Sequence, residues 1–357
     1  MILKECFSDA FITSHAGDNI DKKRIYEKVV HAFYLLEKVA DTGLPFVFKG
    51  GTSLMLLLKE FNRFSVDVDI LMKPEYEGEI CKTVLNFKDD VFINVKEDKR
   101  KPADIIKRHF KFFFDSIYDE KNIIESYVLL DIVFDDLHYK NTKQYNIDSK
   151  FVKTDNPYLQ VTIPDINEML GDKLTAFAPK TIGILYARPN QIRSKHVEII
   201  KQLYDVSKLY DNITNLENVK ETYISVAKVQ IKNRNLTLTY EDALKDTIEA
   251  CKLIIIQDKR KTDPESYKIL NKGYEGFKNF TINDFTFQEL VTMAVKVYIL
   301  AISLLYTSSF LEEEKPINCF IGKEYKIIRQ RVGLHLYSKL MQACYIENRF
   351  KDKKNNN

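Results

Sequence analysis

Glycine, proline and cysteine are all scarce in this chain of 357 residues, which has 11 Gly, 9 Pro and 5 Cys. So few glycines and prolines exclude a collagen-like or low-complexity chain. The cysteines are odd in number and scattered, with no CxxC pair and no zinc-site spacing, so they exclude a disulfide framework. Free cysteines are typical of a reducing compartment, and we therefore expect a cytoplasmic protein.

The chain also lacks an excess of one charge and a long apolar run. Its 54 Lys and Arg against 51 Asp and Glu give a net charge of +3, which excludes binding of nucleic acid by bulk charge but allows a local basic face. Charges at Lys4 and Asp9 interrupt the region where a signal peptide would be apolar. The most apolar stretch, 290–305, is bordered by Glu289 and contains Lys296, so we expect no membrane span.

The length predicts two domains or one large elaborated domain, at roughly 100 to 200 residues per domain. Residues 1–164 are expected to form an α+β core with an N-terminal cover helix at 21–43. The hydrophobic period changes from strand-like to helical near residue 165, so 165–350 is expected to be a mostly helical domain. The last residues, 351–357, are lysine- and asparagine-rich and are expected to be a disordered tail.

Within the core, a short apolar strand at 44–51 ends in two glycines and is followed by a buried helix at 52–61. A strand at 64–72 then alternates polar and apolar residues. Further strands are predicted at 91–95, 109–117, 127–134 and 158–164, and later helices at 166–177, 195–210, 239–256 and 286–306.

Asp67 and Asp69 are separated by one residue on the predicted strand, so both carboxylates project to the same side. Such a pair can bind a divalent cation, although the same pattern also occurs by chance on exposed strands. Oxygen ligands with no nearby His or Cys favour Mg²⁺ or Mn²⁺ over zinc.

Gly50 and Gly51 lie between a buried strand and the start of a helix, where backbone N–H groups can bind a phosphate. Thr52 and Ser53 can add hydroxyl groups. A plain tight turn is the alternative, and neither GxxxxGK[ST] nor GxGxxG is present here. The combination of the glycine turn with the Asp67 pair favours a nucleotide site.

Asp131 lies inside an otherwise apolar strand, which is a costly position for a carboxylate unless it is paired or holds a metal. We interpret it as a third carboxylate of the site, with Asp135 as the second choice. The alternative is a strand with one face in solvent.

Lys173 falls on the apolar stripe of the 166–177 helix, so its ammonium group is expected to reach a phosphate or a carboxylate. Asp205 lies among apolar residues and is expected to pair with Lys201 or with Lys173. A lysine with only its stem buried and an exposed helical ion pair are the alternatives.

The segment KGGTSL at 49–54 followed by RFSVDVD at 63–69 resembles the signature of the AbiE-type (AbiEii/AbiGii) abortive-infection toxins, a branch of the polymerase-β-like nucleotidyltransferases. Glu168, Lys173, Leu174 and Ala176, and the run KQLYDV at 201–206, resemble later motifs of that family. Lys201 and Gln202 depart from its usual arginine and acidic residue. The resemblance implies a polymerase-β-like core, a mixed sheet flanked by helices, followed by a mostly helical C-terminal domain.

The resemblance also implies a function. It predicts the toxin of a toxin–antitoxin or phage-defence system, an enzyme that transfers a nucleoside monophosphate from an NTP to an acceptor hydroxyl and releases pyrophosphate. In related toxins the acceptor is the tRNA 3′ end. The implied partners are an NTP, tRNA and a cognate antitoxin.

The resemblance assigns roles residue by residue. Asp67 and Asp69 become ligands of Mg²⁺ or Mn²⁺, and Asp131 a third ligand and general base, the last by analogy with the wider superfamily. The remaining implied roles are a nucleotide cradle at Gly50, Gly51, Thr52, Ser53, Arg63 and Ser65, a phosphate contact for Lys173, and an orienting or base-assisting role for Asp205.

A tRNA acceptor would require a basic surface beside the site, and Lys96–Lys111 and Arg188–Lys201 are the candidate segments. Each is alternatively a solvated loop or helix face. Other functional hypotheses are transfer to a small molecule or protein side chain, and a catalytically idle nucleotide-binding module. The presence of both Asp67 and Asp69 argues against the idle module.

Overall fold

The chain forms two compact units. The computed structural model describes residues 1–99, 106–119, 125–136, 139–186, 195–259, 261–307, 311 and 328–355. The first unit comprises Met1–Asp165 with Asn279–Asn283, and the second comprises Ile166–Lys278 with Asp284–Asn357. The change of hydrophobic period lies near residue 165, but no sequence pattern predicts that 279–283 packs with the first unit.

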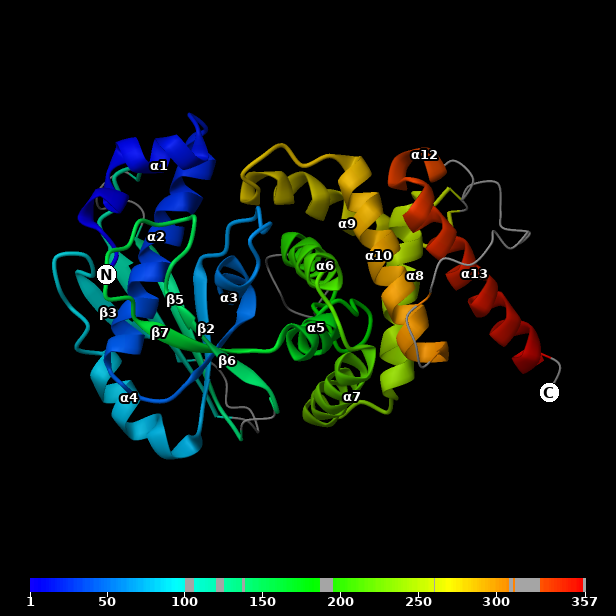
Figure 1. The fold of residues 1–357 in the computed structure, drawn as a ribbon, viewed down its shortest axis with the longest axis horizontal. Coiled ribbons are helices and arrows are strands. Elements are labelled where there is room, and N and C mark those ends of the chain that lie inside the picture. Colours follow the sequence, from blue (N-terminus) through cyan, green and yellow to red (C-terminus); the bar gives the residue numbers. More distant parts are fainter. Residues whose placement is uncertain are drawn as a thin grey trace. The chain divides into compact units, whose positions relative to one another are not determined.

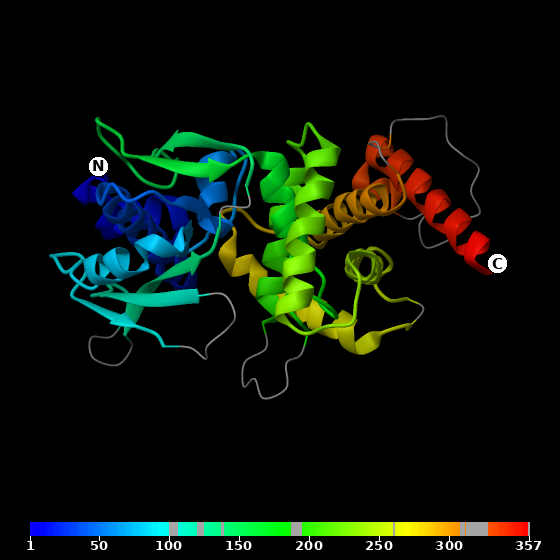
Figure 2. The ribbon, with the colours of Figure 1, turned by 90° about the horizontal axis from the view of Figure 1, so that it is seen from below.

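The first unit is built on a mixed seven-stranded sheet of order β3-β4-β5-β2-β1-β7-β6 (Figure 1). Two pairs, β1 with β7 and β2 with β5, are parallel, and the others are antiparallel. Figure 2 shows β6 and β7 as a hairpin at one edge. The strands are β1 (Val47–Lys49), β2 (Asp67–Met72), β3 (Asn94–Glu97), β4 (Ile106–Phe114), β5 (Ser126–Phe134), β6 (Thr142–Asn146) and β7 (Gln160–Pro164).

Short and long helices flank this sheet, as expected for the α+β core. They are η1 (Lys4–Phe7), α1 (Asp9–Ala16), α2 (Ile20–Asp41), α3 (Gly50–Leu57), η2 (Pro74–Tyr76) and α4 (Glu77–Val84). The long helix α2 begins at Ile20 because the side chain of Asn19 accepts hydrogen bonds from the N–H groups of Asp21 and Lys22. The cover helix therefore starts one residue before Asp21.

Helix α2 covers one face of the sheet, and the carboxylates lie on the other. The imidazole of His31 stacks on Phe114 of β4, with ring centroids 3.6 Å apart. Alternation along β4 places Phe110 on that same face. Phe110 is paired with Leu130 of β5, and Leu130 is paired with Val68 of β2, so these three buried residues form one row on the face that α2 covers. Asp67 and Asp69 flank Val68 along β2, and Asp131 follows Leu130 along β5. Their side chains therefore lie on the opposite face of the sheet and are half-buried.

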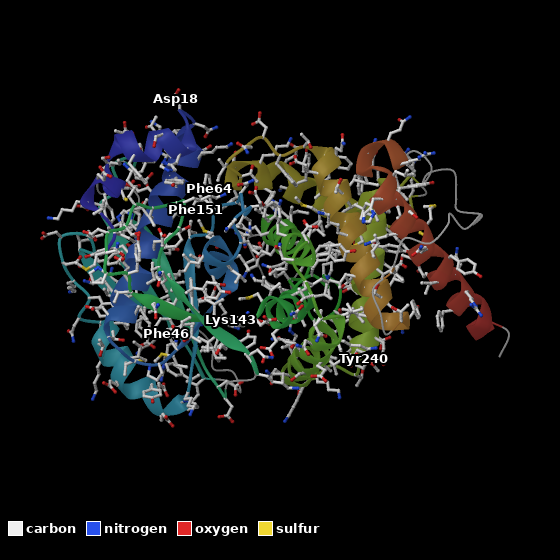
Figure 3. The ribbon with its side chains drawn as sticks, viewed as in Figure 1. Asp18, Phe46, Phe64, Lys143, Phe151 and Tyr240 are labelled. Carbon is white, nitrogen blue, oxygen red and sulfur yellow. The ribbon has the colours of Figure 1, made fainter. Side chains whose placement is uncertain are left out.

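Tyr26 of α2 contacts two other segments of the first unit. Its ring packs edge to face against that of Phe64, with centroids 5.3 Å apart, and its hydroxyl donates to the carbonyl oxygen of Phe151 at 2.8 Å. Figure 3 labels Phe64 and Phe151, both of which are buried. Burial raises the pKa of the Tyr26 hydroxyl, which therefore remains protonated and able to donate.

The second unit is helical. Its helices are α5 (Ile166–Thr175), α6 (His196–Tyr210), α7 (Leu216–Asn233), α8 (Tyr240–Ile256), α9 (Pro264–Phe277), α10 (Phe287–Tyr306), α12 (Arg329–Val332) and α13 (Leu334–Asn355), and η3 (Lys278–Phe280) follows α9. Helix α10 packs against α6, α8 and α13. In Figure 1, α8 and α10 run side by side.

Two features of this half bear on what the sequence predicts. Helix α10 has 20 residues and a mean hydropathy of 1.7 over its most apolar window, so by length and composition it could cross a membrane. Because 72% of that window is buried inside the protein, we interpret it as a core helix. The segment 351–355 is also not an irregular tail, since α13 continues to Asn355; lysine is a good helix former and extends a helix already begun.

Burial of His31 predicts a pH dependence of stability. Burial lowers the pKa of His31 from 6.5 to about 4, so the unfolded chain binds this proton more readily and stability falls as the pH decreases through that window. Between about pH 7 and about pH 5, the unfolding free energy of the wild type should fall by about 2 kcal/mol more than that of His31→Phe. Urea unfolding at both pH values measures this, and parallel losses in the two proteins would contradict it.

Candidate active site

Three carboxylates share one face of the central strands. Asp67 and Asp69 alternate on β2, and the parallel register places Asp131 of β5 directly beside Asp69. All three are partly exposed. Asp135 follows the end of β5, where its N–H donates to the carbonyl oxygen of Met72, so the register favours Asp131 over Asp135 as the neighbour of the pair.

The Asp69 carboxylate lies against the first glycine of the turn. Gly50 begins α3 immediately after β1 and has φ +82°, a conformation that strains any other residue. A Cβ atom at this position would lie 2.0 Å from Oδ2 of Asp69. Both the backbone and the neighbouring carboxylate therefore require glycine here.

The second glycine is in close contact with two further motif residues. A Cβ atom on Gly51 would lie 2.5 Å from Nη2 of Arg63 and 2.6 Å from Oγ of Ser65. Arg63 is only 2% exposed, and its Nη1 donates to the carbonyl oxygen of Phe64 at 2.9 Å. The two halves of the sequence motif thus fit together at one corner, which we call the diglycine corner: Gly50, Gly51, Arg63, Ser65 and Asp69.

The two hydroxyl groups of the turn face the protein. Thr52 Oγ1 donates to the carbonyl oxygen of Asp67, and Ser53 Oγ donates to that of Gly50 at 3.0 Å, and both residues are fully buried. These hydroxyls hold the turn and β2 together. Groups that can bind a phosphate are the N–H groups of the first turn of α3, which have no partner within the helix.

His109 is a site residue that the sequence analysis missed. Its Nδ1 lies 2.7 Å from Oδ1 of Asp131, and the two residues are directly opposite each other on β4 and β5. Their side chains are 11% and 26% exposed. The sequence pattern of β4 predicts which residues share a face with His109. It does not predict that His109 lies opposite Asp131, because this depends on the pairing of β4 with β5.

The donor set fits a magnesium-type ion through two carboxylates. Among the residues that the structure describes, no three His, Cys, Asp or Glu side chains are grouped to hold a metal. Mg²⁺ is usually held by one or two carboxylates, with substrate phosphates and water completing the shell. Asp67 and Asp69 meet that requirement from one strand face, while Asp131 contacts His109.

Lys173 and Asp205 form a buried ion pair in the second unit. Nζ of Lys173 on α5 donates to Oδ2 of Asp205 on α6 at 3.0 Å, with the side chains 11% and 0% exposed. Lys201 bonds Glu198 at 3.0 Å. The pairing of Asp205 with Lys173, one of the two that the sequence allowed, is present in the structure.

The two basic segments differ in exposure. Lys96 on β3 pairs in register with Lys111 on β4, so both lie on the face that carries His109. In the other segment, Lys201 is buried beside Glu198 and adds little to the surface. The parts at 100–105 and 187–194 lie outside the described residues.

Comparison with known proteins gives the family. The model of the family "Nucleotidyl transferase AbiEii toxin, Type IV TA system" matches residues 34–286, which is more than half of the chain. The chain belongs to the AbiEii nucleotidyl transferase toxin family. The matched range contains the diglycine corner, the three carboxylates, and Lys173 with Asp205.

Two solved structures are similar to this AbiEii protein, and the first of them supports the fold. MenT4, a nucleotidyltransferase toxin from Mycobacterium tuberculosis, is similar with a TM-score of 0.51 and 13% identity, over 83% of this chain and 99% of that one. JHP933 from Helicobacter pylori is similar with a TM-score of 0.41 and 14% identity, over 84% and 93%. No curated protein matches the chain.

Family membership confirms the nucleotidyltransferase prediction. The protein is a nucleotidyltransferase toxin of a type IV toxin–antitoxin system, which implies a nucleotide substrate and a cognate antitoxin. The fold prediction is confirmed too, since a mixed seven-stranded sheet with flanking helices precedes a helical region.

Gly50→Ala should uncouple activity from stability. The added Cβ atom collides with Asp69, so nucleotidyl transfer should fall about a hundredfold as the carboxylate is displaced. Gly43→Ala is the matched control, because Gly43 has φ +71° with nothing within 4 Å of the added atom. Gly43→Ala should lose about 1 kcal/mol of stability from backbone strain alone, and Gly50→Ala should lose more because of the added collision. Equal transfer rates in the two variants would refute the steric argument.

The buried ion pair should contribute to both stability and activity. Lys173→Met removes the ammonium group from the fully buried Asp205 and should lower the unfolding free energy by about 3 kcal/mol. The double variant Lys173→Met, Asp205→Asn should recover most of that stability without recovering transfer. Urea unfolding and transfer assays test both outcomes, and full activity in the double variant would show that the pair is only structural.

Proposed function

We propose that this toxin transfers a nucleoside monophosphate from an NTP to the 3′ end of tRNA, with Mg²⁺ or Mn²⁺, in the cytoplasm. The single observation that supports the proposal most is the diglycine corner, where a carboxylate of the Asp67–Asp69 pair lies against the N-terminus of α3. A triphosphate bound to the helix N–H groups would be next to the carboxylates that hold its counter-ion.

The reaction is an in-line displacement. The acceptor hydroxyl oxygen forms a bond to the α-phosphorus, and the bond between that phosphorus and the oxygen bridging to the β-phosphorus breaks, so pyrophosphate leaves with the electron pair. Divalent ions, when bound, neutralise charge on the attacking and leaving oxygens. The protein's own groups mainly position the reactants and stabilise charge.

Each residue of the first unit has a proposed role. Asp67 and Asp69 hold the ion, while the N–H groups of Gly50 and Gly51 and of the turn that follows bind phosphate oxygens. Thr52 and Ser53 fix the turn through their hydroxyls. Arg63 and Ser65 fill the space that a side chain at Gly51 would otherwise occupy.

Asp131 is proposed as the group that accepts the proton of the acceptor hydroxyl and as a third ligand. His109 orients this carboxylate through the 2.7 Å contact. In the second unit, Lys173 is proposed to meet charge on the triphosphate, with Asp205 fixing its ammonium group.

A polyanionic acceptor is supported by the strand face beyond His109. Lys96 and Lys111 lie next to each other there, and each ammonium group lies over an aromatic ring, 4.9 Å from the centroid of Phe113 and 5.0 Å from that of Tyr127. Each lysine also pairs with a carboxylate, Lys96 with Glu125 at 3.8 Å and Lys111 with Asp98 at 3.5 Å, and this face adjoins the row of catalytic carboxylates through His109. Such a surface suits the phosphates of an RNA end.

Asp67→Ala should abolish both transfer and growth inhibition, because it removes one of the two carboxylates on β2. Asp136→Ala is the control, since this exposed carboxylate lies beyond the end of β5. Each variant and the wild type are incubated with an α-labelled NTP and with purified tRNA, total protein or small-molecule extract. The labelled species is then identified, and the tRNA 3′ ends are sequenced. If the label enters protein or small molecules and not tRNA, tRNA is not the acceptor and the proposal is wrong on this point. Toxicity of a folded Asp67→Ala variant would contradict nucleotidyl transfer as its cause.

A further inference from the structure

Residues Asn279–Asn283, here called the return segment, belong to the first unit although they lie between α9 and α10 of the second. Thr281 forms an antiparallel bridge with Arg63. The N–H of Phe64 donates to the carbonyl oxygen of Phe280 at 2.7 Å, and the N–H of Ile282 donates to that of Asn62 at 3.0 Å. The return segment therefore pairs with the strand-like stretch that leads into β2.

This pairing supports the arginine of the diglycine corner. Arg63 and Thr281 lie between the two backbone hydrogen bonds, which is the arrangement that brings opposed side chains close together. They are 2% and 4% exposed. The guanidinium group at the other end of Arg63 lies against Gly51, so the return segment lies behind the residue that fills the corner.

Two lysines anchor the same stretch. Lys22 on α2 donates to the carbonyl oxygen of Ile282 at 3.3 Å. Lys150 donates to Oδ1 of Asn62 at 2.8 Å and to the carbonyl oxygen of Lys59 at 3.1 Å. Residues 59–64 are thus held by the return segment and Lys150, while α2 holds the return segment itself.

We propose that the return segment is a positioning element of the active site: its bridge to Arg63 fixes the diglycine corner and so sets the affinity for the NTP. This inference rests on the proposed binding of the nucleotide at that corner. No residue of the return segment is assigned a contact with the nucleotide, so the segment acts through Arg63. It makes a stretch late in the sequence part of the nucleotide site.

Ile282→Pro in the full chain tests the proposal, because proline removes the N–H that bonds Asn62. Asp284→Pro is the matched control, at an exposed position outside the return segment, where the added ring does not restrict Ile282. Ile282→Pro should raise the KM and the Kd for NTP about tenfold, while the KM for the acceptor and the kcat change less. Asp284→Pro should keep the wild-type values.

Thr281→Ala gives a milder second test that keeps the backbone bonds. It removes the side-chain atoms that pack beside Arg63, and it should raise the Kd for NTP about threefold. Wild-type Kd values in both Ile282→Pro and Thr281→Ala would overturn the proposal, even if their melting temperatures fall, because that result describes a purely structural role. If the wild type binds NTP but modifies no tRNA, the proposed function fails while the Kd comparison still decides the role of the return segment.

Discussion

The contact between the carboxylate of Asp69 and the Cα atom of Gly50 is the constraint on which the rest of the site depends. It is available only because Gly50 has no side chain and because its positive φ turns β1 directly into α3. The contact brings a negative side chain close to the positive end of a helix, an arrangement that is favourable by itself and that becomes a binding site when an anion and a cation are both present.

The architecture of the first unit explains why the three carboxylates share one face. Helix α2 packs on the opposite face through His31, and strand alternation places Asp67, Asp69 and Asp131 on the other, where they are partly exposed. Polar groups gather there without the cost of full burial. The carboxylates are thus consequences of the same alternation that builds the core.

Much of this could be predicted from the sequence because the signals are local. The spacing of Asp67 and Asp69 predicts that their side chains lie on the same face of the strand. The position of Lys173 on an apolar stripe predicts a polar partner for its ammonium group, and that partner is Asp205. Contacts set by strand register could not be predicted. His109 meets Asp131, and Thr281 meets Arg63, only through pairing between segments that no local pattern links.

Two helix boundaries also differ from those that the sequence predicts. The helix after the diglycine turn begins at Gly50 itself and ends at Leu57, earlier than its leucine-rich sequence predicts. Helix α13 extends through a lysine-rich end that composition alone assigns to a tail. The end of α13 follows the helix propensity of lysine, whereas α3 ends where Leu58 adopts an extended backbone conformation.

The most direct measurement of the central claim is anomalous scattering from crystals grown with Mn²⁺ and a non-hydrolysable NTP analogue. The account predicts a manganese peak about 2 Å from carboxylate oxygens of both Asp67 and Asp69, with the triphosphate on the N–H groups at the start of α3. A bound triphosphate elsewhere on the protein, with no manganese at this pair, would contradict it.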